Sequence, residues 1–297
     1  MKDYETFKAA VVEQLEELVG GCTFAIEKIA KVNRGTLDAL SARYPGDMFA
    51  PCIYIEDMYA AYMDGASLDD IVRSVATSLK RSDRSEHLYR QAMGTISNIK
   101  KRVYLQVVGK ERNLEVMKDC PHRCIEDLLI LYYILVKDSE EGLVTVQVTY
   151  SIAEEHGLNE EELFRLATAN TKRLLPTVII PIVDLPVDLP VGYDMYPPIY
   201  ILTNQRFFNG ASAILDNDTL SRLCEEVEDD LYLLPSSIHE VLAVPVSSMD
   251  PGYLNGLIQF VNRTELDPAE KLADHVYVFR RSTKMEGVIL WKQKQEL

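Results

Sequence analysis

The sequence predicts an α+β fold of two domains, each a mainly antiparallel sheet with packed helices. Stretches with apolar residues at helical spacing alternate with strand-length runs rich in Val, Ile, Leu, Tyr and Thr. The last third of the chain follows the order β-β-α-β-β-α-α-β-β, which is typical of an antiparallel sheet with helices. A chain of 297 residues is long enough for one large or two ordinary hydrophobic cores.

The N-terminal domain is predicted over residues 1–176. Its first helix carries an apolar stripe, and Gly20-Gly21 ends it. The second helix begins with the capping pattern of Ser67 and Asp70, and the third begins with Asn159 and Glu162. The expected elements are helices over 4–18, 67–79 and 159–174, and strands over 23–32, 50–55, 103–108, 128–136 and 143–150.

A proline-rich connector is predicted over residues 177–198. Six of the thirteen prolines fall between Pro176 and Pro198, and the tetrapeptide Val-Asp-Leu-Pro occurs twice in succession over 183–190. Proline lacks a backbone donor and has a fixed φ, so this segment cannot continue a helix or lie centrally in a sheet. An alternative interpretation is a recognition strip, because extended proline-rich segments are pre-ordered for docking.

The C-terminal domain is predicted over residues 199–297. Asn209-Gly210 favours a two-residue turn and predicts a hairpin between strands over 199–208 and 211–215. Asp250-Pro251 starts a helix with Leu254, Leu257, Ile258 and Val261 facing inward, and Asp267-Pro268 repeats that start. The other expected elements are a helix from Asp218 and strands over 231–234, 241–246, 276–279 and 288–291.

The charge and the cysteines indicate a soluble cytoplasmic protein. The formal net charge is −15, which argues against general affinity for nucleic acids or anionic membranes. Five scattered cysteines are typical of a reduced protein, and no secretory signal is present at the N-terminus. The longest apolar runs have about half the ~18 residues that a membrane span needs. Because phosphate-binding glycine motifs are missing, we expect no nucleotide cofactor.

The segment 235–240, Pro-Ser-Ser-Ile-His-Glu, has the residue types of nucleophilic catalysis. Ser237, His239 and Glu240 are its candidate residues, because such catalysis needs a hydroxyl, a base and a group that orients the base. In a strand, Ser237 and His239 share a face while Glu240 points to the other one. A polar turn with a hydrogen-bonded histidine is the simpler interpretation.

A second group of reactive side chains comprises Cys120, His122 and Cys124. Zinc sites pair cysteines at such spacings but need a second pair of ligands, which the sequence does not supply. We therefore expect no metal and interpret the thiols as buried or half-buried residues beside a turn.

Basic residues gather over residues 78–112, where nine Lys and Arg side chains face three acidic ones. The basic segment 80–112 gives this acidic molecule a polarity that suits an acidic partner, an RNA or the acidic face of a second copy. Lys100, Lys101 and Arg102 are its candidate partner-binding residues. A solvated helix and loop is the structural alternative.

Several short segments, in order along nearly the whole chain, match the pattern of a known family. They are Ala50-Pro51-Cys52-Ile53-Tyr54-Ile55-Glu56, Tyr62-Met63-Asp64-Gly65, Glu111-Arg112-Asn113, Pro121-His122-Arg123, Asp127-Leu128, Leu202-Thr203-Asn204, Gly210-Ala211-Ser212 and Pro235-Ser236-Ser237-Ile238-His239-Glu240-Val241. In these segments the chain resembles the domain-of-unknown-function family 5688. The resemblance implies an uncharacterised protein of gut-dwelling Gram-positive bacteria, a cytoplasmic accessory protein often associated with mobile elements. It implies no activity, cofactor or catalytic residue.

Three hypotheses follow for the function. The first is a non-enzymatic binding or regulatory protein that acts through protein surfaces, with a protein partner or with a second copy of itself. The second is a hydrolase that uses Ser237 and His239 with a carboxylate from elsewhere. The third is nucleic-acid binding by the segment 80–112, which the overall charge disfavours.

Overall fold

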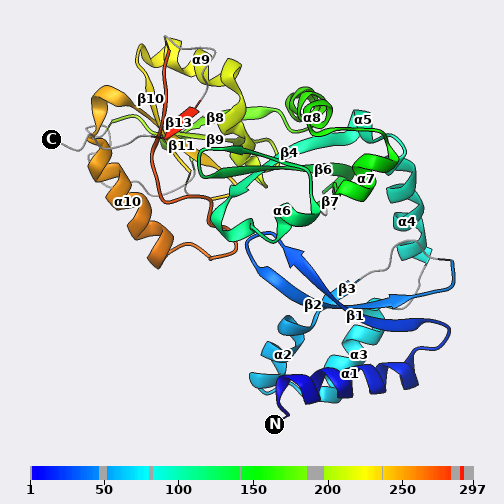
Figure 1. The fold of residues 1–297 in the computed structure, drawn as a ribbon. Helices are drawn as coiled ribbons and strands as arrows, with labels where there is room; N and C mark the ends of the chain where they lie inside the picture. The colour runs from blue at the N-terminus through cyan, green and yellow to red at the C-terminus, as the bar shows by residue number, and fades with distance from the viewer. Residues whose placement is uncertain are drawn as a thin grey trace. The chain divides into compact units, whose positions relative to one another are not determined.

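The fold is α+β, as the sequence predicts, with sheets in which every strand pair is antiparallel (Figure 1). The computed structural model describes residues 2–46, 52–79, 83–140, 142–185, 197–235, 237–281 and 288–290, with the backbone alone for 83–89 and 288–290. The chain divides into two compact units, Met1–Gly94 and Thr95–Leu297.

The first unit contains a three-stranded sheet in the order β1-β2-β3 with helices on one face (Figure 1). A nine-residue register joins β1 and β2, and the link between them has a positive φ at Asn33 and Gly35. The elements are α1 (Tyr4–Leu18), β1 (Thr23–Lys31), β2 (Gly35–Arg43), β3 (Cys52–Tyr54), α2 (Ile55–Met63) and α3 (Leu68–Leu79); α4 (Asp83–Ile96) runs into the second unit.

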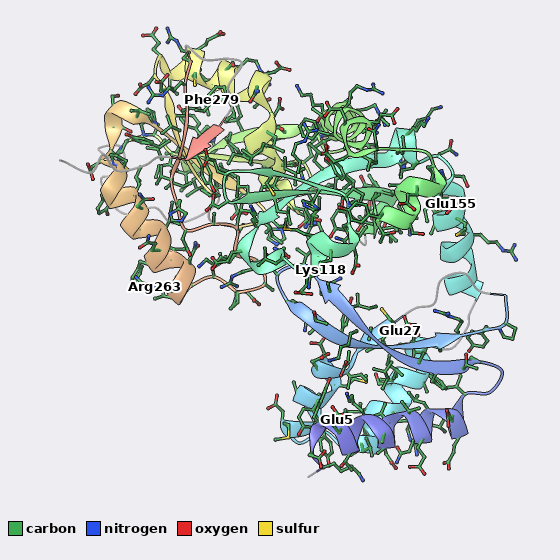
Figure 2. All side chains as sticks on the ribbon, viewed as in Figure 1. Glu5, Glu27, Lys118, Glu155, Arg263 and Phe279 are labelled. Carbon is green, nitrogen blue, oxygen red and sulfur yellow. The ribbon has the colours of Figure 1, made fainter. Side chains whose placement is uncertain are left out.

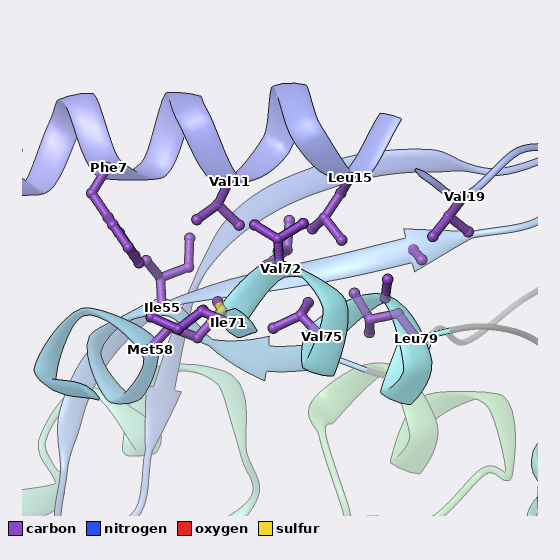
Figure 3. Close-up of a cluster of buried hydrophobic side chains, with 13 residues drawn as sticks. Phe7, Val11, Leu15, Val19, Ile55, Met58, Ile71, Val72, Val75 and Leu79 are labelled. Atoms are coloured by element: carbon purple, nitrogen blue, oxygen red, sulfur yellow. The ribbon is translucent and has the colours of Figure 1, made fainter. Parts of the chain in front are cut away.

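The core of the first unit lies between α1, α2, α3 and the sheet (Figure 3). Phe7, Val11 and Leu15 lie at helical spacing on α1 and are fully buried against Val72 and Leu79 of α3. The apolar stripes predicted for these two helices therefore meet each other, which is what an amphipathic stripe requires.

The second unit contains two sheets. The four-stranded sheet has the order β4-β6-β5, and β7 pairs with β6 beyond the end of β5. The six-stranded sheet has the order β13-β12-β10-β11-β9-β8. The strands are β4 (Val103–Gly109), β5 (His122–Ile125), β6 (Leu128–Ser139), β7 (Gly142–Gln147), β8 (Thr177–Pro181), β9 (Tyr200–Asn204), β10 (Leu231–Leu234), β11 (Val241–Pro245), β12 (Tyr277–Phe279) and β13 (Val288–Leu290).

Helices pack on both sheets. The capping box predicted at Asn159 and Glu162 begins α8, which packs on β4, and α10 covers Tyr232, Leu234 and Val244 of the six-stranded sheet. The short helix η4 contacts β4, β9 and β11 and so links the two sheets. The helices are α5 (Ile99–Arg102), η1 (Glu111–Asn113), α6 (Val116–Asp119), α7 (Tyr150–Glu155), α8 (Glu160–Leu174), η2 (Ile182–Asp184), η4 (Gly210–Leu215), α9 (Asn217–Val227), η5 (Val246–Ser248) and α10 (Pro251–Thr264).

The division into units falls at Gly94 and Thr95, whereas the sequence predicts a connector over 177–198. Residues 177–181 of that connector form β8, an edge strand that pairs with β9. Pro181 ends this strand, in keeping with the restriction of proline to edge strands. The predicted connector also includes residues 186–196, which lie outside the described residues.

Two predictions of secondary structure in the second unit are wrong. Asn209 does adopt a positive φ of 52°, but the chain then enters η4 instead of a second hairpin strand, and β9 pairs with β8 and β11. Asp267-Pro268 starts a turn and no helix, although the Asp267 side chain accepts a hydrogen bond from the Ala269 N–H. Both motifs supply the local geometry of a turn, which several continuations of the chain can satisfy.

We predict that Phe7→Ala lowers the free energy of unfolding of the first unit by about 3–5 kcal/mol, because it leaves a cavity in the core. Phe7 is fully buried and contacts the rings of Tyr59 and Tyr62. The matched control is Leu18→Ala on the same helix, whose side chain is 49% exposed. Urea denaturation followed by circular dichroism measures both variants, and equal effects would contradict the assigned core.

We also predict a dependence of stability on acid pH that comes from Asp38. A hydrogen bond from Lys8, at 2.8 Å, lowers the pKa of the Asp38 carboxyl below its ordinary value. This stabilisation is complete above the unfolded-state pKa of about 4 and is lost as the pH falls through the folded-state pKa. Asp38→Asn should therefore flatten the loss of thermal stability between about pH 4 and pH 2. An unchanged slope would show that Asp38 does not contribute.

Candidate functional site

The segment 235–240 connects β10 to β11, and Ser237 lies buried within it, at 2% exposure. The Ser237 hydroxyl donates a hydrogen bond to Glu240 Oε1 at 2.8 Å and accepts one from the His239 backbone N–H at 3.0 Å. Ser236 lies outside the described residues. The hydroxyl thus closes a turn between the two strands.

The imidazole of His239 faces other groups. Its Nδ1 accepts a hydrogen bond from the backbone N–H of Asn209 at 3.1 Å, and its Nε2 lies 3.6 Å from Glu270 Oε1. The ring also packs on Phe208, with centroids 5.2 Å apart. The structure therefore brings Ser237 and Glu240 together without placing an imidazole nitrogen on the Ser237 hydroxyl. A nucleophile needs that contact, so this geometry gives the hydrolase hypothesis no support.

Gly210 explains why His239 holds this position. A Cβ atom at residue 210 would lie 2.5 Å from the His239 carbonyl oxygen and 2.2 Å from the Thr203 hydroxyl. The same hydroxyl donates to the same carbonyl at 2.7 Å. Only glycine permits the start of η4 to lie this close to the connection between β10 and β11.

The residues Cys120, His122 and Cys124 do not gather around one point. Cys120 is buried, and burial raises the pKa of its thiol to about 11, whereas Cys124 on β5 is exposed. His122 Nδ1 donates to the Cys120 carbonyl oxygen at 2.9 Å. In the part of the chain that the structure describes, no three His, Cys, Asp or Glu side chains form a metal-binding group.

The candidate partner-binding residues Lys100, Lys101 and Arg102 make up most of α5. The side chains of Lys100 and Lys101 are exposed, while Arg102 donates from Nε to the Leu135 carbonyl oxygen at 2.8 Å. Arg102 thus ties α5 to β6. The seven buried residues of β4 separate this group from Lys110 and Arg112, by about 20 Å at the rise of a strand. Lys110 and Arg112 therefore lie apart from Lys100, Lys101 and Arg102.

The sequence did not predict a charged cleft of ≈310 Å³ that lies beyond the end of β4. Residues 109–112, Asp127 and residues 271–275 line it. We call it the β4 cleft. These residues belong to three separate parts of the chain, and the sequence does not show that the charged residues among them lie together.

Hydrogen bonds hold the acidic side chains of the β4 cleft in place. The buried Tyr277 hydroxyl donates to Asp127 Oδ1, and Asp127 Oδ2 lies 3.7 Å from His275 Nε2. Burial, and then the hydrogen bond to Asp127, raise the pKa of Tyr277. Burial alone would raise the pKa of Asp274, but hydrogen bonds from Asn262 and Lys271 outweigh it and hold that pKa below the ordinary value.

A second unexpected feature is the outer face of α10, the α10 face, which consists of Tyr253, Leu257 and Phe260. Their side chains are 62%, 40% and 54% exposed. The spacing of four and three residues puts them on one side of the helix, while Leu254 and Ile258 are buried on the other side. The prediction that Leu257 faces inward is therefore wrong, because the helix carries apolar residues on both faces.

We predict that Ser237→Ala lowers the free energy of unfolding by about 1–3 kcal/mol, because the Glu240 carboxylate and the His239 N–H lose their partner. Ser151→Ala, at an exposed serine on α7, is the matched control and should stay within about 0.5 kcal/mol of the parent. A fluorophosphonate probe should leave Ser237 unmodified in the folded protein, as intact-mass spectrometry would measure. Stoichiometric labelling of Ser237 would restore the hydrolase hypothesis.

The described helices include none with both the length and the apolar character to cross a membrane. No curated protein and no solved structure matches the chain. A family model described as a family of unknown function, DUF5688, matches the chain over residues 4–281. The predicted resemblance is thus confirmed, and the chain belongs to this family of unknown function.

Proposed function

We propose that the protein is a non-enzymatic accessory protein that acts through protein surfaces, and that its main binding surface is the α10 face. The observation that carries this proposal is the exposure of Tyr253, Leu257 and Phe260 side by side on one helix. Single exposed apolar residues are ordinary, but a continuous exposed stripe of two aromatic rings and a leucine is typical of an interface.

The occupant we propose for the α10 face is a second copy of the chain. Tyr253 and Phe260 lie equally far along the helix from the point between Gly256 and Leu257. An antiparallel two-fold pair therefore puts Tyr253 of one copy beside Phe260 of the other, with the two Leu257 side chains meeting near the axis. Gly256 has open space where a Cβ would stand, which allows the two helices to approach closely.

The charges at the two ends of α10 fit the same arrangement. Asp250, the N-cap residue, and Arg263, in the last turn, are both exposed and are also symmetric about the point between Gly256 and Leu257. Figure 2 shows Arg263 on α10. In the antiparallel pair, each Asp250 lies at the level of the other copy's Arg263. Opposite charges at the rim favour this orientation over the parallel one.

Two further expectations belong to this proposal. The exposed ammonium groups of Lys100 and Lys101 are available to an acidic partner, whereas Arg102 is engaged by backbone carbonyls.

We also propose a cytoplasmic location, which the five free cysteines support, because two of them are buried and unpaired.

We predict that the protein forms dimers and that Tyr253→Ser/Phe260→Ser raises the Kd of the dimer by about 10- to 100-fold. The matched control is Leu114→Ser/Val183→Ser, which removes two apolar side chains of similar exposure, 53% and 54%, elsewhere in the same unit. Sedimentation velocity over a concentration series measures both Kd values.

A cross-link tests the orientation. In a background with the exposed Cys52 and Cys124 replaced by serine, Leu257→Cys should form an intermolecular disulfide on oxidation, whereas Gln259→Cys, on the flank of the helix, should not. A protein that stays monomeric, or a dimer that the Tyr253/Phe260 variant leaves intact, would contradict the proposed surface.

A further inference from the structure

The β4 cleft has the dimensions and the rigidity of a small-molecule site. Its volume of ≈310 Å³ lies at the lower end of ligand pockets. At its base, a Cβ atom on Gly109 would lie 2.4 Å from the Leu272 carbonyl oxygen, so the two walls meet backbone to backbone. The Lys110 N–H donates to the Asp127 carbonyl oxygen at 2.9 Å and fixes the third wall.

Most charges of the β4 cleft are already balanced within it. Lys271 Nζ donates to Asp274 Oδ2 at 2.5 Å, and Asn262 donates to the other oxygen of the same carboxylate at 2.8 Å. The Asp127 carboxylate accepts a hydrogen bond from the Tyr277 hydroxyl and lies beside the His275 ring. The Asp127 and Asp274 carboxylates therefore already have hydrogen-bond partners and repel an anionic ligand less than free carboxylates would.

The remaining cations lie together at the end of β4. The residue Lys110 is half-buried and lines the cleft, and its ammonium makes no hydrogen bond or ion pair with any described residue. Arg112 uses one terminal nitrogen on the Pro268 carbonyl oxygen at 2.8 Å, which leaves most of its guanidinium donors free. Glu111 between them is exposed to solvent. The charged donors of Lys110 and Arg112 are therefore available to an anionic ligand.

We propose that the β4 cleft binds a small tetrahedral oxyanion, such as the phosphate group of a phosphorylated metabolite. Lys110 and Arg112 supply the charge, and His275, 49% exposed and held beside Asp127, supplies a further donor from the opposite wall. Donors on two walls of one cleft suit the three oxygens of a phosphate monoester better than the two oxygens of a planar carboxylate. This site is separate from the α10 face and does not depend on the proposed dimer.

The test is a titration of the full-length protein with inorganic phosphate, phenyl phosphate and acetate, each at constant ionic strength, because salt screens exposed charges. Isothermal calorimetry gives the Kd, and NMR of ring-labelled histidines reports His275. We expect saturable binding of both phosphates, a shift of the His275 ring signals, and binding of acetate that is at least tenfold weaker. Binding of phenyl phosphate alone would assign the site to an ester, and binding of both phosphates would assign it to the phosphate group.

The variants locate the site. Lys110→Met should weaken phosphate binding at least tenfold, Lys110→Arg should keep it within about threefold, and Lys28→Met, at an exposed lysine on β1 that does not line the cleft, should leave it unchanged. If Lys110→Met lowers the thermal midpoint, the comparison of Lys110→Arg with Lys110→Gln takes its place. Absence of saturable binding of both inorganic and phenyl phosphate, equal affinity for acetate, or equal effects of the Lys110 and Lys28 variants would overturn the proposal.

Discussion

The second unit depends on backbone contacts that leave no room for side chains. Gly109 ends β4 in the four-stranded sheet, and the carbonyl of Leu272 precedes β12 in the six-stranded sheet. Gly210 makes a similar approach to the His239 carbonyl at the start of η4, which contacts strands of both sheets. Close packing transmits small changes of volume, so a methyl group at either position would push the two sheets apart. The β4 cleft exists because the first of these contacts holds its walls together.

The segment from Ser237 to Glu240 shows how residues with the chemistry of catalysis can serve a turn. Each of these polar groups has a hydrogen-bond partner. The serine hydroxyl donates to the Glu240 carboxylate and accepts from the His239 N–H, and the histidine ring accepts from the Asn209 N–H. A buried polar group must find a partner, and neighbours in sequence are the nearest partners available. Reactive residue types that are consecutive in sequence therefore point first to local satisfaction, while catalytic groups are typically brought together from distant segments.

Local patterns predicted four helices correctly, although Asn209-Gly210 and Asp267-Pro268 did not continue as expected. The capping box of α8, the Asp-Pro start of α10 and the stripes of α1 and α3 all describe a helix and its own first turn, and all four helices are present. The sequence does not predict β2. Apart from Thr36, residues Gly35–Arg43 lack the β-branched and aromatic residues of a typical strand. The sequence does not predict the β4 cleft either, because only the pairing of strands brings Lys110, Asp127 and His275 together. The prediction for Leu257 was wrong because periodicity shows which residues of a helix are apolar. It does not show which of two apolar faces packs against the protein.

The helix α10 joins the two features that carry the functional proposals. Its outer side presents Tyr253, Leu257 and Phe260, while on its inner side the buried Asn262 donates to the Ala273 carbonyl and to the Asp274 carboxylate, which line the β4 cleft. Asn255 of the same helix accepts the N–H of Val276. Two asparagines therefore fix the helix to the segment that forms one wall of the cleft. Burial of Leu254 and Ile258 alone allows small rotations of α10 about its axis. The directed hydrogen bonds of the two asparagine side chains oppose these rotations, so the helix presents its apolar face in a fixed orientation. The same bonds that keep the cleft wall in place thus also orient the exposed aromatic rings.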